Sequence, residues 1–145
     1  MSAVPTESSA TAAEVVRRMY DAFSRGDVAT ILGLAAPDVV VYQSPSVPWG
    51  GLRTGAEGLQ QFLGSLTSTL RSAVETGELY DDGDGHVVQS GRTRGEVIAT
   101  GVAFDVAETH VWTVADGLVE RFDSYIDVAA MRRALEAETA GAGAR

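Results

Sequence analysis

One stretch of the chain, residues 103–115, sets a carboxylate and an imidazole among bulky apolar side chains. Alternate residues of a β-strand share a face, so Glu108 and His110 would point to the same side. That side also carries the apolar residues Phe104, Val106, Trp112 and Val114. Burying a carboxylate or an imidazole in apolar surroundings is costly unless a partner compensates for the lost water. The pattern therefore predicts a pocket at this strand.

His110 is the leading candidate for acid/base chemistry, because an imidazole titrates near ~6.5 and exchanges protons at neutral pH. Glu108 lies two residues away, about 6.5–7 Å between Cα atoms on a strand, and can tune the imidazole or share a ligand with it. Structural alternatives stay open for both residues. His110 can be a core histidine satisfied by a tyrosine or a backbone group. For Glu108 an ion pair is favoured, with a partner among the arginines Arg92, Arg94 and Arg121.

Composition excludes several classes of protein. The chain has 145 residues, 45% of them hydrophobic, which suits one globular domain with a sizeable core. It has no cysteine, so disulfides and thiolate sites are impossible. Its net charge of −9 argues against nucleic acid or an anionic membrane surface as a partner. No apolar run reaches the length of a membrane span, and we expect a cytoplasmic protein.

The sequence predicts no metal site and no cofactor. His86 and His110 are far apart and form no His-x-x-x-His pair. The aspartates at 81, 82 and 84 resemble the start of a calcium loop, but the bidentate glutamate that should follow is missing.

Periodicity and turn residues predict helices first and strands last. A helix is expected at 12–24 after the N-cap Thr11, and a short one from Asp27 to Leu34. The later elements expected are a strand at 39–42, a Pro/Gly-rich loop at 44–55, a helix at 56–72, strands at 73–81, 86–98, 103–115 and 118–126, and a helix from Asp127 to Glu138. This order predicts one α+β domain at 11–138, with a disordered lead-in at 1–10 and a flexible tail at 139–145.

Six short segments follow one another along the chain: Val15–Tyr20 before Gly26-Asp27, Pro37–Val41, Trp49–Gly51, Gly55–Gly58, Ala115–Val119 and Tyr125–Asp127. In this order they resemble the nuclear transport factor 2-like superfamily, and within it the SnoaL-like group. The superfamily includes the SnoaL-like polyketide cyclases, the ketosteroid isomerases and the limonene-epoxide hydrolases. The resemblance implies a cone-shaped α+β barrel, in which a curved antiparallel sheet and N-terminal helices enclose a mostly apolar pocket, usually in a homodimer.

The functional residues of these relatives carry over only in part. The aspartate base and the tyrosine of the ketosteroid isomerases fall on Ser44 and Met19, so both are expected to be missing. The histidine of the cyclases falls on His110, but their aspartate, like that of the epoxide hydrolases, falls on Ser124. The epoxide hydrolases also need an Asp/Arg pair on the preceding strand, where this chain has Arg92, Thr93 and Arg94. The sequence therefore matches no named mechanism completely.

The resemblance implies a small-molecule enzyme of secondary metabolism that performs cofactor-free cyclisation, isomerisation or epoxide opening on an apolar, polyketide- or terpenoid-like ligand. His110 and Glu108 are the predicted catalytic residues. The predicted substrate-binding residues are Tyr42, Ser44, Trp49, Trp112, Phe122 and Ser124. The alternative is a non-catalytic binding or dimerisation module of the same fold. Serines in place of the family's two acids favour that alternative, as does the small, mildly polar outer face of 103–115, which suits a homodimer.

Overall fold

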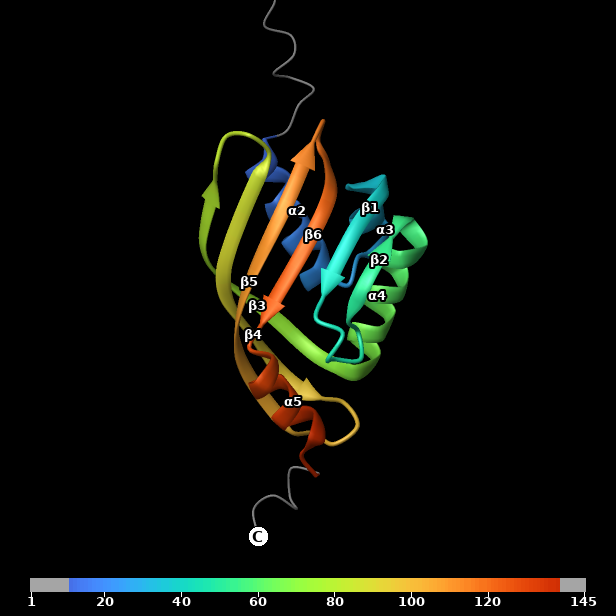
Figure 1. Ribbon diagram of the computed structural model, residues 1–145, viewed down its shortest axis with the longest axis vertical. Coiled ribbons are helices and arrows are strands. Elements are labelled where there is room, and N and C mark those ends of the chain that lie inside the picture. Colours follow the sequence, from blue (N-terminus) through green and yellow to red (C-terminus); the bar gives the residue numbers. More distant parts are fainter. Residues whose placement is uncertain (1–10, 139–145) are drawn as a thin grey trace, which may run out of the picture.

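The structure, a computed structural model, describes residues 11–138 (Figure 1). Its helices are α2 (Ala12–Ser24), α3 (Val28–Gly33), α4 (Gly55–Thr69) and α5 (Val128–Glu136). Its strands are β1 (Ala35–Gln43), β2 (Gly51–Thr54), β3 (Leu70–Asp81), β4 (His86–Val97), β5 (Ala103–Ala115) and β6 (Leu118–Ile126). The predicted lead-in at 1–10 and tail at 139–145 lie outside the described residues.

The strands form one curved sheet in the order β2-β1-β6-β5-β4-β3. All neighbours pair antiparallel except β1 and β6, which are parallel. In Figure 1, α2 lies behind the sheet and α4 runs alongside β1 and β2. The predicted α+β class, with helices covering a curved and mostly antiparallel sheet, is confirmed. Among the described residues, no helix is long and apolar enough to cross a membrane.

Helix α2 forms where the sequence predicts it, and its cap explains why. The Thr11 hydroxyl accepts the Glu14 backbone N–H at 3.1 Å, while the Glu14 carboxylate accepts the Thr11 N–H at 2.9 Å. One side of the helix is buried, through Ala13, Val15, Val16, Met19 and Ala22. The helix therefore packs this face on the sheet, and Tyr20 lies at the edge of the buried face.

Several element boundaries differ from the prediction. Strand β1 begins at Ala35, because Pro37 falls where the β1–β6 register is irregular and no regular ladder bond is required of it. Strand β2 lies inside the predicted loop at 44–55, and α5 ends at Glu136 instead of Glu138. Helix α4 passes directly into β3 at Leu70, and no glycine or proline marks that junction.

A bulge between β3 and β4 fixes one buried side chain of the sheet. The register of the two strands shifts between Thr76 and Glu78. This shift frees the backbone N–H of Gly77, which donates to Gln89 Oε1 at 3.0 Å. A Cβ at Gly91 would lie 2.5 Å from the same amide oxygen and would also meet the β3 backbone. Glycine at 91 is therefore required for Gln89 to point inward and stay fixed.

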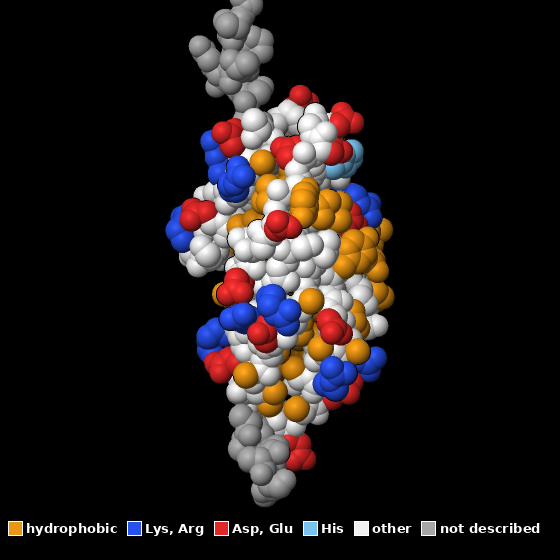
Figure 2. All heavy atoms as spheres, turned by 90° about the vertical axis from the view of Figure 1, so that its left-hand side faces the viewer, with side chains coloured by type: hydrophobic (Ala, Val, Ile, Leu, Met, Phe, Trp, Pro, Cys, Tyr) orange, Lys and Arg blue, Asp and Glu red, His pale blue; other side chains and the backbone are white. Residues whose placement is uncertain are grey.

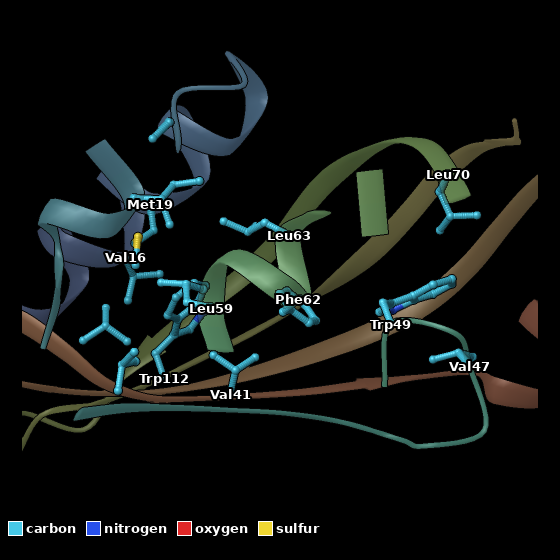
Figure 3. Close-up of a cluster of buried hydrophobic side chains, with 14 of the residues drawn as sticks. Val16, Met19, Val41, Val47, Trp49, Leu59, Phe62, Leu63, Leu70 and Trp112 are labelled. Atoms are coloured by element: carbon cyan, nitrogen blue, oxygen red, sulfur yellow. The ribbon is translucent and has the colours of Figure 1, made fainter. Parts of the chain in front are cut away.

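The hydrophobic core lies between the concave face of the sheet and helices α2 and α4. Figure 3 shows Met19 of α2 and Leu59 and Phe62 of α4 on one side, with Val41 and Trp112 of the sheet on the other. All five side chains are buried. The outer surface, by contrast, mixes acidic and basic side chains over the face shown in Figure 2. The packing leaves the inner face of β5 beneath helix α2.

Gly91→Ala should lower the free energy of unfolding by roughly 1–3 kcal/mol, because the new methyl group meets the Gln89 amide and the β3 backbone. The matched control is Gly64→Ala in α4, where a Cβ meets nothing within 4 Å. That substitution should be neutral or stabilising by up to about 1 kcal/mol, because alanine favours a helix. Urea denaturation measures both, and equal stability of the two variants would contradict the requirement at Gly91.

Candidate functional site

A row of four polar side chains crosses the concave face of the sheet. The strand register sets Gln43 of β1 beside Ser124 of β6, Ser124 beside His110 of β5, and His110 beside Gln89 of β4. All four residues are buried, with 6% exposure or less. Neighbouring strands lie about 4.8 Å apart, so the row, called here the polar row, extends over roughly 14 Å.

The polar row borders a cavity of about 110 Å³ between the sheet and the helices. Gln43, Ser124 and His110 line it, and so does Tyr20 of α2, whereas Gln89 does not. Most of the other lining side chains are apolar or aromatic, and among the described residues that line the cavity none is Lys, Arg, Asp or Glu. The site is therefore an apolar pocket with polar groups concentrated on the sheet.

His110 has a polar neighbour at each ring nitrogen. The Tyr20 hydroxyl lies 2.7 Å from Nδ1, and Glu108 Oε2 lies 3.2 Å from Nε2. The Tyr20 oxygen itself receives the Trp112 indole N–H and a Gln89 amide N–H, each at 3.0 Å. Because these two groups only donate, the Tyr20 hydroxyl is free to give its proton to Nδ1. The imidazole proton is then on Nε2, the nitrogen that faces Glu108.

The carboxylate of Glu108 contacts Gln89 and His110 and is not paired with an arginine. The hydrogen-bonded group of Tyr20, Gln89, Glu108, His110 and Trp112 is called here the polar centre. Gln89 donates its amide N–H to Glu108 Oε1 at 2.8 Å, and His110 faces the other oxygen. The predicted ion pair is therefore corrected. The three arginines considered as partners are engaged elsewhere: Arg92 and Arg94 bind Asp105, and Arg121 binds Asp123. Asp105 points to the face of β5 opposite to Glu108, and Asp123 belongs to β6. These three arginines are therefore engaged away from Glu108.

Burial controls the proton equilibria of the centre. Loss of water lowers the pKa of His110 to about 3, and it raises the pKa of Glu108, an effect that the Gln89 hydrogen bond partly opposes. Burial also raises the pKa of Tyr20, against the donors Trp112 and Gln89. His110 is therefore neutral at pH 7. Its contribution to stability is complete above about 6.5, the value expected for an unfolded histidine, and is lost as the pH falls from there toward 3.

Five of the eight predicted site residues line the cavity, and three do not. Trp49, Trp112, Phe122 and Ser124 line it together with His110. Glu108 is buried behind His110 and reaches the pocket only through that ring.

Tyr42 and Ser44 are corrected, because alternation on β1 turns Val41 and Gln43 inward instead. The Tyr42 ring packs on Tyr125, with centroids 6.0 Å apart. The Ser44 hydroxyl accepts the Ser46 backbone N–H at 3.2 Å and stabilises the turn after β1.

Sequence reasoning missed three residues of the site: Tyr20, Gln43 and Gln89. The tyrosine of the ketosteroid isomerases was expected to be missing at Met19, yet the next residue, Tyr20, places a hydroxyl against His110. A signal for both glutamines was present. Gln43 is two residues after the buried Val41 on β1, and Gln89 is two residues after the buried Val87 on β4, so each shares a face with apolar side chains. Applying to them the rule used for the strand of His110 would have found both.

Comparison with known proteins agrees with this architecture. The model of the SnoaL-like domain matches residues 16–122. The chain belongs to the SnoaL-like domain family. The matched range includes Tyr20, Gln43, Gln89 and His110, and it ends just before Ser124. It therefore spans all but one position of the pocket's polar groups.

Relatives and solved structures extend the same likeness over most of the chain. An uncharacterised protein of Mycobacterium tuberculosis is 29% identical over 120 residues, which cover 81% of this chain and 90% of that protein. An NTF2-like protein from Burkholderia thailandensis has a TM-score of 0.81 at 25% identity, over 88% of this chain and 99% of its own. An NTF2-like protein of unknown function from Burkholderia pseudomallei has the same TM-score and coverage at 24% identity. These likenesses confirm the predicted cone fold of the superfamily.

Tyr20→Phe should lower the free energy of unfolding by roughly 1–3 kcal/mol, because it leaves two buried donors and His110 Nδ1 without the hydroxyl that they contact. The same substitution at the exposed Tyr125 is the control and should change stability by less than about 0.5 kcal/mol. Thermal and urea unfolding measure the difference. A Tyr20→Phe variant as stable as Tyr125→Phe would show that the hydrogen-bonded centre is not formed.

Proposed function

We propose that this SnoaL-like protein binds a mostly apolar small molecule in the pocket and performs cofactor-free acid/base chemistry on it at His110. One observation carries the proposal: His110 is the titratable imidazole of an otherwise uncharged cavity wall, and Glu108 lies 3.2 Å behind it. A carboxylate behind an imidazole fixes its tautomer and stabilises the imidazolium that forms when the ring takes a proton. A polyketide- or terpenoid-like substrate of secondary metabolism suits the apolar and aromatic walls.

The step we propose uses the nitrogen that faces Tyr20. A substrate hydroxyl, or a water that it holds, takes the place of the Tyr20 hydroxyl at Nδ1, and the neutral ring then accepts its proton. Because burial alone lowers the pKa of His110 to about 3, the charged ring depends on Glu108 as its counter-ion. The proton returns from Nδ1 to the rearranged substrate, so the enzyme is unchanged after each turnover. One positioned acid/base group supplies roughly 10²–10⁴-fold in rate, which suits an already activated substrate.

The second candidate is a non-catalytic binding protein of the same fold. It is favoured by one feature, namely that both nitrogens of His110 already have partners in the protein. In that case the centre is a structural network, and the pocket only holds its ligand. A homodimer stays a prediction under either candidate, supported by the small side chains on the outer face of β5, such as Ala103 and Ala107, which are exposed.

Turnover by the wild type and by His110→Gln separates the two candidates. The panel contains aromatic polyketides, sterols and terpene epoxides, with thermal shift reporting binding and mass spectrometry reporting products. A ligand at 100 times its dissociation constant stabilises by about 2.7 kcal/mol, enough to detect in the shift. We expect His110→Gln to keep the shift and to lose roughly 10²–10⁴-fold in turnover.

His86→Gln is the matched control, because His86 is exposed and bonded to Asp82 at the surface. It should keep full turnover and full binding. Undiminished turnover in His110→Gln would contradict the proposed chemistry. Ligand binding without turnover by the wild type would favour the non-catalytic candidate.

A further inference from the structure

Gln43 lines the pocket, and its side-chain amide nitrogen is satisfied by none of the described residues. Its residue is 1% exposed, and its Nε2 has no hydrogen-bond partner among the described residues. Most buried amides in proteins are hydrogen-bonded, because a buried amide without a partner has lost its hydrogen bonds to water and gained none in return. An unpartnered donor that lines a cavity therefore indicates a group that arrives with a ligand.

Gln89 shows what a structural glutamine looks like in the same fold. It belongs to the same polar row, is equally buried, and uses both ends of its amide. Its oxygen accepts the Gly77 N–H, and its nitrogen donates to Tyr20 and Glu108. The row thus has a closed end, where every partner is protein, and an open end at Gln43.

The chemistry of the open end selects the kind of ligand group. Gln43 offers amide N–H donors, and the neighbouring Ser124 adds a hydroxyl on the same side of the sheet. The described lining residues include no Lys or Arg, so an anionic group would lose its water without gaining a counter-charge. A neutral oxygen acceptor needs no counter-charge and can accept the amide N–H of Gln43.

We propose that Gln43 anchors a neutral carbonyl oxygen of the ligand, of the ketone, ester or quinone type, at the open end of the polar row. The inference rests on the proposed function for the pocket, and it specifies which substrate class that pocket takes. Gln43 and His110 are two strand intervals apart, about 10 Å between backbones. The anchored carbonyl and the group facing His110 therefore belong to different parts of one extended or polycyclic skeleton.

The first test compares two leucine substitutions without any ligand. Gln43→Leu removes an amide whose nitrogen has no partner among the described residues, so its Tm should equal or exceed that of the wild type. Gln89→Leu removes an equally buried amide whose oxygen and nitrogen both have protein partners, and its Tm should fall by several degrees. If Gln43→Leu lowers the Tm as much as Gln89→Leu, the amide has a structural role and the proposal is overturned. Gln43→Met, which keeps the side-chain volume, replaces Gln43→Leu if that variant does not fold.

The second test measures binding of 9-fluorenone and of fluorene, the matched hydrocarbon, by equilibrium dialysis. The wild type should bind the ketone at least ~10-fold more tightly, and Gln43→Leu should bind the two equally. A ketone preference that persists in Gln43→Leu overturns the anchor, as does equal binding of both probes by the wild type. In the latter case the pocket itself still stands. Failure of the wild type to bind either probe counts against the proposed pocket as well as the anchor.

Discussion

The hydrogen bond from the Tyr20 hydroxyl to His110 Nδ1, 2.7 Å long, is the contact on which the rest of the site depends. A buried imidazole needs a partner at both nitrogens, and helix α2 supplies one of them from outside the sheet. Once that bond exists, the donors Trp112 and Gln89 and the acceptor Glu108 all have defined roles. The packing of α2 on the sheet and the burial of the Glu108 carboxylate therefore depend on each other.

The division of the polar row into a closed and an open end has a functional consequence. At the closed end, protein groups satisfy one another and fix the imidazole in one tautomer without a charge. At the open end, Gln43 and Ser124 border the cavity, so that end is available to a ligand. Under the proposed function, ligand anchoring and acid/base chemistry lie on nearby parts of one sheet, and the register of the strands sets the distance between them.

Alternation along one strand was enough to predict His110 and Glu108 on an inward face, and caps and turns were enough to predict α2 and the later hairpins. The partners of His110 were harder, because Tyr20 is 90 residues away in the chain and no local pattern joins them. The bulge at Gly77 that fixes Gln89 depends on the pairing of two strands and left no readable signal. Tyr42 and Ser44 were misplaced for a simpler reason: strand alternation was not applied to β1, where Val39 and Val41 share the inward face with Gln43.

The central claim is that His110 is held neutral, with its proton on Nε2, between Tyr20 and Glu108. Nitrogen-15 NMR of the imidazole rings tests it most directly, with the exposed His86 giving a separate signal. The account predicts that His110 shows a protonated Nε2 and an unprotonated Nδ1 at pH 7, and that it stays neutral down to pH 5, because burial lowers its pKa to about 3. A His110 ring protonated on both nitrogens at pH 6, or one that carries its single proton on Nδ1, would contradict the account.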